Sequence, residues 1–125
     1  MTSNNRFERG DVFSNQCPSR EILRHVTGRW GMLVFWALRD GEPQRFSQLR
    51  RRIEGGSEKM LAQTLQQLEA DGFVARIEYP VVPPHVEYQL TTLGKAFGER
   101  VIDLIDWLEG NLLTILDQQV TPPTA

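Results

Sequence analysis

The apolar residues of this chain recur mainly at the three- and four-residue spacing of amphipathic helices. Leu61, Leu65 and Leu68 fall at positions i, i+4 and i+7 of one stretch and predict a single buried stripe. Ser57 is suited to cap the start of this helix, and Gly72 is suited to end it. We therefore expect a helix between these two residues that lays one face against the core.

Four further stretches show helical spacing. One helix begins at Pro18, because proline suits the first helical turn. A shorter helix follows Ser47, and a long last helix begins at Thr91 or Thr92. The remaining helix lies between residues 28 and 41 and is expected to bury Trp30, Leu33, Val34, Ala37 and Leu38.

Only the stretch 73–90 alternates as a strand does. Val86, Tyr88 and Leu90 alternate along its second half, and three prolines at positions 80, 83 and 84 interrupt its middle. Since proline cannot donate to a sheet ladder, the prolines belong in a stiff tip between two strands. The order of elements predicts a mainly α fold with a small β-hairpin (α+β). It is a winged helix-turn-helix with extra N- and C-terminal dimerisation helices.

The length of 125 residues is that of one domain. We expect an N-terminal arm at residues 1–16 and a winged-helix domain at residues 17–118. Within that domain the wing spans about 79–88 and the dimerisation helix about 92–118. Residues 119–125 are expected to form a flexible tail.

Charge is distributed unevenly along the chain, although the net charge is only −2. Residues 20–59 hold nine Lys or Arg against five Asp or Glu, whereas residues 60–125 hold three against nine. The basic part coincides with the predicted helix-turn-helix, which favours a nucleic-acid partner.

Other classes of protein find little support in the sequence. The apolar run Met32–Leu38 is far too short to span a membrane, and the first residues lack the apolar region of a secretory signal. Cys17 is the single cysteine, so no internal disulfide can form. We expect a cytoplasmic protein. His25 and His85 are far apart and no phosphate-binding loop is present, so we expect neither an enzyme nor a metal or other cofactor.

Several spaced motifs resemble those of one known family. They are Cys17-Pro18, Gly28-Arg29-Trp30, Phe46-Ser47-Gln48-Leu49, the segment SEKMLAQTLQQLEADGF from Ser57 and the segment YPVVPPHVEYQLTTLG from Tyr79. In this order they resemble the HxlR-type winged-helix transcriptional regulators, and among them the YtfH-like bacterial proteins. The resemblance covers roughly residues 17–97. It implies a bacterial homodimer that binds a pseudo-palindromic DNA operator.

The resemblance also marks two departures from the commoner family pattern. Thr64 stands where many members carry arginine, and His85 stands where lysine or arginine is usual in the wing. Both differences weaken the expected grip on phosphates, which leaves the affinity and the half-site sequence open.

The candidate DNA-binding residues come from three elements. They are Ser57, Glu58, Lys59, Gln63, Thr64, Gln66, Arg50, Arg51, Arg52 and His85. Gln63 can pair with adenine, Lys59 can reach guanine or phosphate, and Ser57 at the helix N-terminus can hold a phosphate. At least one of the three arginines is expected on a phosphate, and the others to pair with acids such as Glu54. His85 at the wing tip is either a phosphate donor or an ordinary loop histidine.

The last helix carries more apolar surface than one small domain can cover, so a second subunit is expected on it. The expected interface residues are Val101, Leu104, Ile105, Trp107, Leu108 and Leu112. The helix that begins at Pro18, together with the N-terminal arm around Phe7 and Phe13, is expected to join this interface.

Cys17 allows two interpretations. It directly precedes a helix N-terminus, where the helix dipole lowers a thiol pKa, and the resemblance implies that some family members sense oxidants or electrophiles at this position. Cysteine is also a common small core residue.

The sequence therefore predicts a sequence-specific DNA-binding regulator, a repressor, that responds through Cys17 if the thiol is a sensor. A small-molecule or electrophile effector fits this hypothesis. The alternative is a winged-helix module that binds proteins without specific DNA binding.

Overall fold

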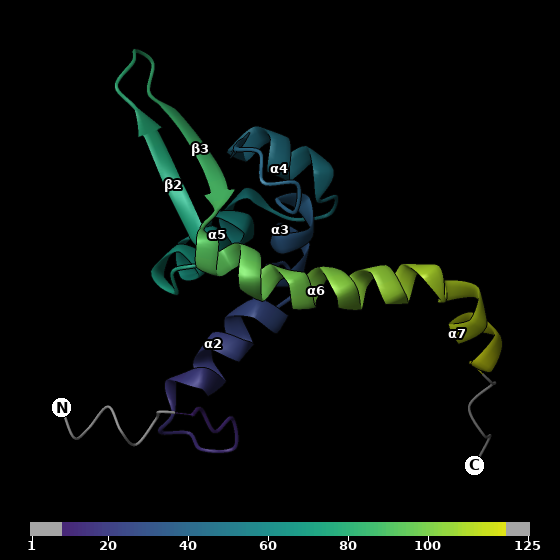
Figure 1. Cartoon of the computed structure of the whole chain (residues 1–125). Helices are drawn as coiled ribbons and strands as arrows, with labels where there is room; N and C mark the ends of the chain where they lie inside the picture. The colour runs from purple at the N-terminus through teal and green to yellow at the C-terminus, as the bar shows by residue number, and fades with distance from the viewer. Residues whose placement is uncertain (1–8, 120–125) are drawn as a thin grey trace.

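The structure is a computed structural model and describes residues 9–119 (Figure 1). Residues 1–8 of the expected arm, Phe7 among them, and residues 120–125 of the expected tail lie outside this range. The described elements are α2 Pro18–Thr27, α3 Gly31–Ala37, β1 Gln44–Arg45, α4 Phe46–Arg52, α5 Glu58–Ala70, β2 Val74–Tyr79, β3 His85–Leu90, α6 Thr92–Gly110 and α7 Leu112–Gln118. The fold is mainly helical with one small sheet, as the sequence predicts.

The helix starts follow the capping signals in the sequence. The Ser57 hydroxyl accepts a bond from the backbone N–H of the third residue of α5 at 3.1 Å. The Thr91 hydroxyl does the same for Gly94 in α6 at 2.9 Å. Helix α4 differs from the prediction, since it begins at Phe46 rather than after a Ser47 cap.

The wing is the outer part of a three-stranded antiparallel sheet with the order β1-β3-β2. Strands β2 and β3 pair from Val74 opposite Leu90 to Tyr79 opposite His85. The prolines occupy residues 80–84, the connection at the tip, as expected for residues without a backbone donor. The two-residue strand β1 pairs with β3 and ties the wing to α4, which directly follows it.

The core lies where helices α2 to α5 and the inner end of the β2-β3 hairpin pack against α6 as far as Ile105. The three leucines of the predicted α5 stripe are all buried in it. Phe35, Phe73 and Phe97 form an aromatic cluster with ring centroids 4.6–5.7 Å apart. Of the five residues predicted to be buried between residues 28 and 41, all but Leu33 are buried, and Phe35 is fully buried in addition.

Helix α6 is anchored at one end and projects beyond the domain at the other (Figure 1). Its first turn touches the start of β2 so closely that a Cβ on Gly94 would lie 1.9 Å from the Phe73 carbonyl oxygen. The predicted continuous helix over 92–118 is wrong, because the chain leaves helical geometry at Asn111 and restarts as α7. Gly110 and Asn111 are weak helix formers, and they stand together at the break. None of the described helices is long and apolar enough to cross a membrane.

Candidate nucleic-acid interface

Helix α5 presents a polar face opposite its buried leucines. Lys59, Gln63 and Gln66 are all exposed on this face. Ser57 is also exposed, although its hydroxyl oxygen is occupied by the capping bond. The face offers one ammonium and two amides, and these groups can donate to or accept from the edges of bases in a major groove.

Thr64 does not belong to this face. Its residue exposure is 8%, and its hydroxyl donates to the carbonyl oxygen of Met60 one turn earlier at 2.9 Å. The side chain lies beside the leucine stripe because position 64 follows Leu61 by three residues and therefore shares its side of the helix. The prediction of Thr64 as a surface contact is corrected accordingly.

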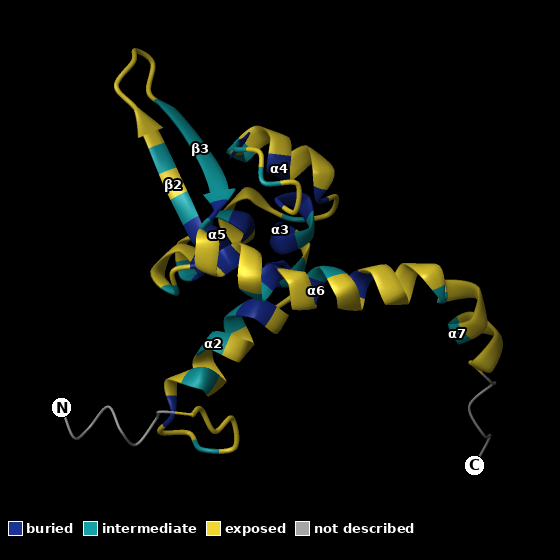
Figure 2. Ribbon diagram, in the orientation of Figure 1, coloured by how far each residue is buried: buried dark blue, intermediate teal, exposed yellow. Residues whose placement is uncertain are grey.

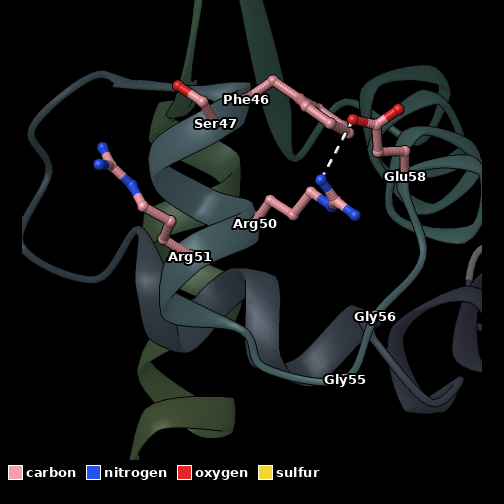
Figure 3. A pocket seen from close by; sticks show the side chains of 7 residues that line it. All are labelled: Phe46, Ser47, Arg50, Arg51, Gly55, Gly56 and Glu58. Carbon is pink, nitrogen blue, oxygen red and sulfur yellow. Dashed lines mark hydrogen bonds and ion pairs between the residues drawn. The ribbon is translucent and has the colours of Figure 1, made fainter.

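The three consecutive arginines of α4 diverge in space, as helical geometry requires. Arg50 reaches toward α5 and pairs with Glu58, with 3.2 Å between Nη1 and Oε1, whereas Arg51 points away from that pair (Figure 3). Arg52 donates to a backbone carbonyl in α3 at 3.1 Å. The acid that pairs with this group is therefore Glu58, rather than the predicted Glu54. All three arginines are exposed.

A hollow of about 520 Å³ opens between α4 and the start of α5. It is lined by Phe46, Ser47, Arg50, Arg51, Gly55, Gly56 and Glu58 (Figure 3). Gly55 has a φ of 89°, which favours glycine, and a Cβ on Gly56 would contact the ring of Trp30 at 3.7 Å. The turn of the helix-turn-helix is thus bare backbone, and two guanidinium groups border the hollow beside it.

The wing places His85 differently from the prediction. His85 is the first residue of β3 rather than a tip residue, and its Nε2 lies 2.8 Å from the Glu87 carboxylate. Tyr79 donates to the same carboxylate at 3.0 Å. The hydrogen bond with His85, followed by that from Tyr79, lowers the pKa of the Glu87 carboxyl. The His85 imidazole is therefore hydrogen-bonded to a carboxylate. The exposed tip consists of the proline- and valine-rich residues 80–84.

Cys17 occupies the N-cap position of α2, where its side chain makes no capping hydrogen bond, and it is 4% exposed. Its sulfur accepts the backbone N–H of Asp11 at 3.4 Å and lies 3.1 Å from the Ser19 hydroxyl. The Asp11 bond, and after it the Ser19 bonds, lower the pKa of the Cys17 thiol. The sequence analysis did not find these two partners, because it attributed the lowered thiol pKa to the helix dipole. The one signal in the sequence was the hydroxyl residue Ser19, which lies only two positions after Cys17.

A side-chain hydrogen bond between α2 and the end of α5 was also missed. His25 Nδ1 lies 2.7 Å from the Asp71 carboxylate, and both side chains are largely buried. No local pattern could reveal this pair, since 46 positions separate its members. No group of three or more His, Cys, Asp or Glu in residues 9–119 could hold a metal ion.

The apolar surface of α6 divides into two parts. Val101 and Ile105, predicted at a subunit interface, are buried in the chain's own core, which is a correction. The other four predicted residues are exposed, with Trp107 at 60%, and Figure 2 shows that exposure continues from the outer part of α6 through α7. These four are Leu104, Trp107, Leu108 and Leu112. Phe13, in the described part of the expected arm, is 93% exposed.

Comparisons with known proteins agree with this geometry. The family model described as HxlR-like helix-turn-helix matches residues 25–115. The HTH-type transcriptional regulator YtfH of Escherichia coli (strain K12) is 60% identical over 111 residues, 89% of this chain and 87% of that protein. The solved structure of ytfH from Salmonella typhimurium has a TM-score of 0.81 at 60% identity and covers 88% of this chain and 97% of that one.

A second solved structure, the redox regulator HypR in its reduced form, has a TM-score of 0.71 at 35% identity. The match covers 80% of this chain and 98% of HypR. The described fold, the motif order and these matches lead to one conclusion. The chain belongs to the HxlR family of winged helix-turn-helix transcriptional regulators.

Proposed function

We propose that this regulator binds a specific pseudo-palindromic DNA operator as a homodimer and represses transcription there. The observation that carries the proposal is the exposed face of Lys59, Gln63 and Gln66 on α5, beside the basic hollow of α4. In a helix-turn-helix the N-terminal part of the second helix enters the major groove, and the neighbouring groups hold the phosphates. Gln63 reads adenine, Lys59 reads guanine or phosphate, and Arg50 and Arg51 contact the backbone.

The test uses a duplex selected by the protein from a random DNA pool. Gln63→Ala and Lys59→Ala should each weaken binding to that duplex by about 1–3 kcal/mol, because each removes a base contact. Gln118→Ala, an exposed glutamine in α7, is the matched control and should bind as the wild type does. Unchanged affinity in both α5 variants would mean that another face is used.

Salt dependence separates the proposal from the alternative of a protein-binding module. A dimer that contacts six or more phosphates should lose affinity on the order of 10³-fold between 50 and 200 mM salt. A flat salt response with every duplex would favour the protein-binding alternative.

The proposed dimer rests on the exposed apolar residues of α6 and α7. Water-exposed clusters of this kind mark interaction surfaces, and a twofold pair would hold two α5 helices at a defined separation on the DNA. Trp107→Glu should convert the protein to monomers in sedimentation experiments. Glu109→Gln, on the same exposed part of α6, should leave the dimer intact. A wild-type protein that sediments as a monomer at micromolar concentration would remove the dimer from the proposal.

We further propose that Cys17 makes the regulator respond to oxidants. The lowered thiol pKa increases the thiolate fraction, which is the reactive form, and the similarity to a redox regulator supports the role. With one cysteine per chain, diamide would join two Cys17 thiols of a dimer, or one Cys17 and a free thiol. Each disulfide formed transfers two electrons and two protons to diamide.

Cys17→Ser should bind the operator normally and no longer respond to diamide in a gel-shift titration. A response equal to the wild type would exclude Cys17.

A further inference from the structure

An ion pair links the two helices of the helix-turn-helix. Arg50 Nη1 in α4 lies 3.2 Å from Glu58 Oε1, the first residue of α5 (Figure 3). Both side chains are accessible, with relative exposures of 49% and 70%. The pair borders the hollow between the helices. A surface ion pair of this kind contributes at most about 1 kcal/mol to the free energy of unfolding. Stability therefore gives little reason for this pair to be present.

The position of Glu58 is costly for a protein that binds DNA. Its carboxylate lies in the first turn of α5, next to Lys59, on the surface proposed to face a polyanion. An acid is favourable at a helix N-terminus because of the helix dipole. It nevertheless repels phosphates, and it occupies a guanidinium that would otherwise be free to bind one.

We propose that Glu58 is a specificity-determining residue that keeps Arg50 from backbone phosphates on non-operator DNA. On the operator, the carboxylate accepts a hydrogen bond from the amino group of a cytosine, and Arg50 turns to a phosphate. This inference rests on the proposed DNA binding and adds a role to a residue that was assigned only as a contact.

The physical basis is discrimination by an unfavourable contact. Cytosine N4 and adenine N6 both present an amino donor in the major groove, but the N7 acceptor of adenine lies beside its amino group and repels a carboxylate, so cytosine is the base that suits Glu. At guanine or thymine the carboxylate would face carbonyl oxygens, so it stays with Arg50 and the phosphate contact is not made. Specificity then comes from weaker binding to wrong sequences as well as from stronger binding to the right one.

The experiment compares Glu58→Gln with Glu54→Gln in the full-length protein. Both changes remove one exposed acid from the same short segment, but Glu54 has no ion pair in the described part of the chain. The probes are the duplex selected from a random pool and a scrambled duplex of equal composition, each titrated at several salt concentrations. Glu58→Gln should bind the scrambled duplex about tenfold more tightly, with a steeper salt dependence, because Arg50 gains a phosphate. Affinity for the selected duplex should rise less, so the specificity ratio falls.

Arg50→Ala provides the decisive background. If Glu58 acts by holding Arg50, the gain from Glu58→Gln on scrambled DNA disappears when Arg50 is absent. A gain that persists there, or an equal gain in Glu54→Gln, would reduce the effect to general charge and overturn the inference. The proposed function is judged separately, since it depends on whether the wild type binds the selected duplex with a salt-dependent affinity.

Discussion

Replacing Gly94 by alanine tests how α6 is joined to the DNA-binding part of the domain. The added Cβ would lie 1.9 Å from the Phe73 carbonyl oxygen and 2.8 Å from its carbonyl carbon. Carbon and carbonyl oxygen normally approach no closer than about 3.3 Å, so the two backbones must separate by about 1.4 Å. Neither neighbour is a flexible side chain, and the strain cannot be relieved by a rotamer change.

The separation would disturb a set of hydrogen bonds at the joint. Phe73 O accepts the Thr91 N–H at 3.0 Å, and the Thr91 hydroxyl donates to the Gly72 carbonyl and caps Gly94. Overpacking of this kind costs about 1–3 kcal/mol, and each weakened hydrogen bond adds about 1 kcal/mol. We expect Gly94→Ala to lose about 3–5 kcal/mol of the free energy of unfolding.

Urea unfolding followed by circular dichroism measures this change. Gly110→Ala in the same helix is the control, because a Cβ there meets no atom within 4 Å. It should leave stability unchanged or raise it by up to about 1 kcal/mol, since alanine is the better helix former. If Gly94→Ala is as stable as Gly110→Ala, the close contact between α6 and β2 does not exist and the reasoning is refuted.

Three further changes test individual side chains. Thr64→Val should leave operator affinity within about twofold of the wild type, because the side chain is buried and its hydroxyl bonds only within α5; a large loss would restore it to the DNA surface. Ser19→Ala should raise the pKa of the Cys17 thiol, so alkylation by iodoacetamide at pH 7 should slow in the folded protein and stay unchanged in denaturant. Equal rates in the folded state would contradict the cause assigned to the pKa. Asp71→Asn weakens the largely buried contact to His25 and should lower the free energy of unfolding by about 1–3 kcal/mol in urea, whereas an unchanged midpoint would show that the pair is not formed.

Two family departures gain a physical context from the structure. Thr64 is turned toward the core, so a longer basic residue at this position would have to leave the path that threonine takes. His85 is bound to Glu87, and the wing tip offers apolar side chains in its place, with Val82 almost fully exposed. The exposed Lys and Arg residues of α4 and α5 are Arg50, Arg51, Arg52 and Lys59, whereas the exposed Arg76 of wing strand β2 pairs with Glu78.

The sequence alone determined most of the elements, their order and two of the helix caps. Ser57 and Thr91 cap the helices expected of them, and the leucine spacing of α5 identifies its buried face. The prolines locate the wing tip between two strands. These signals act between residues only a few positions apart, so they can be recognised without knowledge of the tertiary structure. The family resemblance rests on the same local motifs.

The tertiary structure decided which side chains meet. It paired Arg50 with Glu58 rather than Glu54, and it placed Val101 and Ile105 in the core while the apolar residues beyond them stay exposed. Each outcome depends on how separate helices approach one another, whether they are consecutive, as α4 and α5 are, or distant in the chain, as α3 and α6 are. Helical spacing reports that a residue lies on an apolar face, but the length and angle of the neighbouring element set how much of that face it covers.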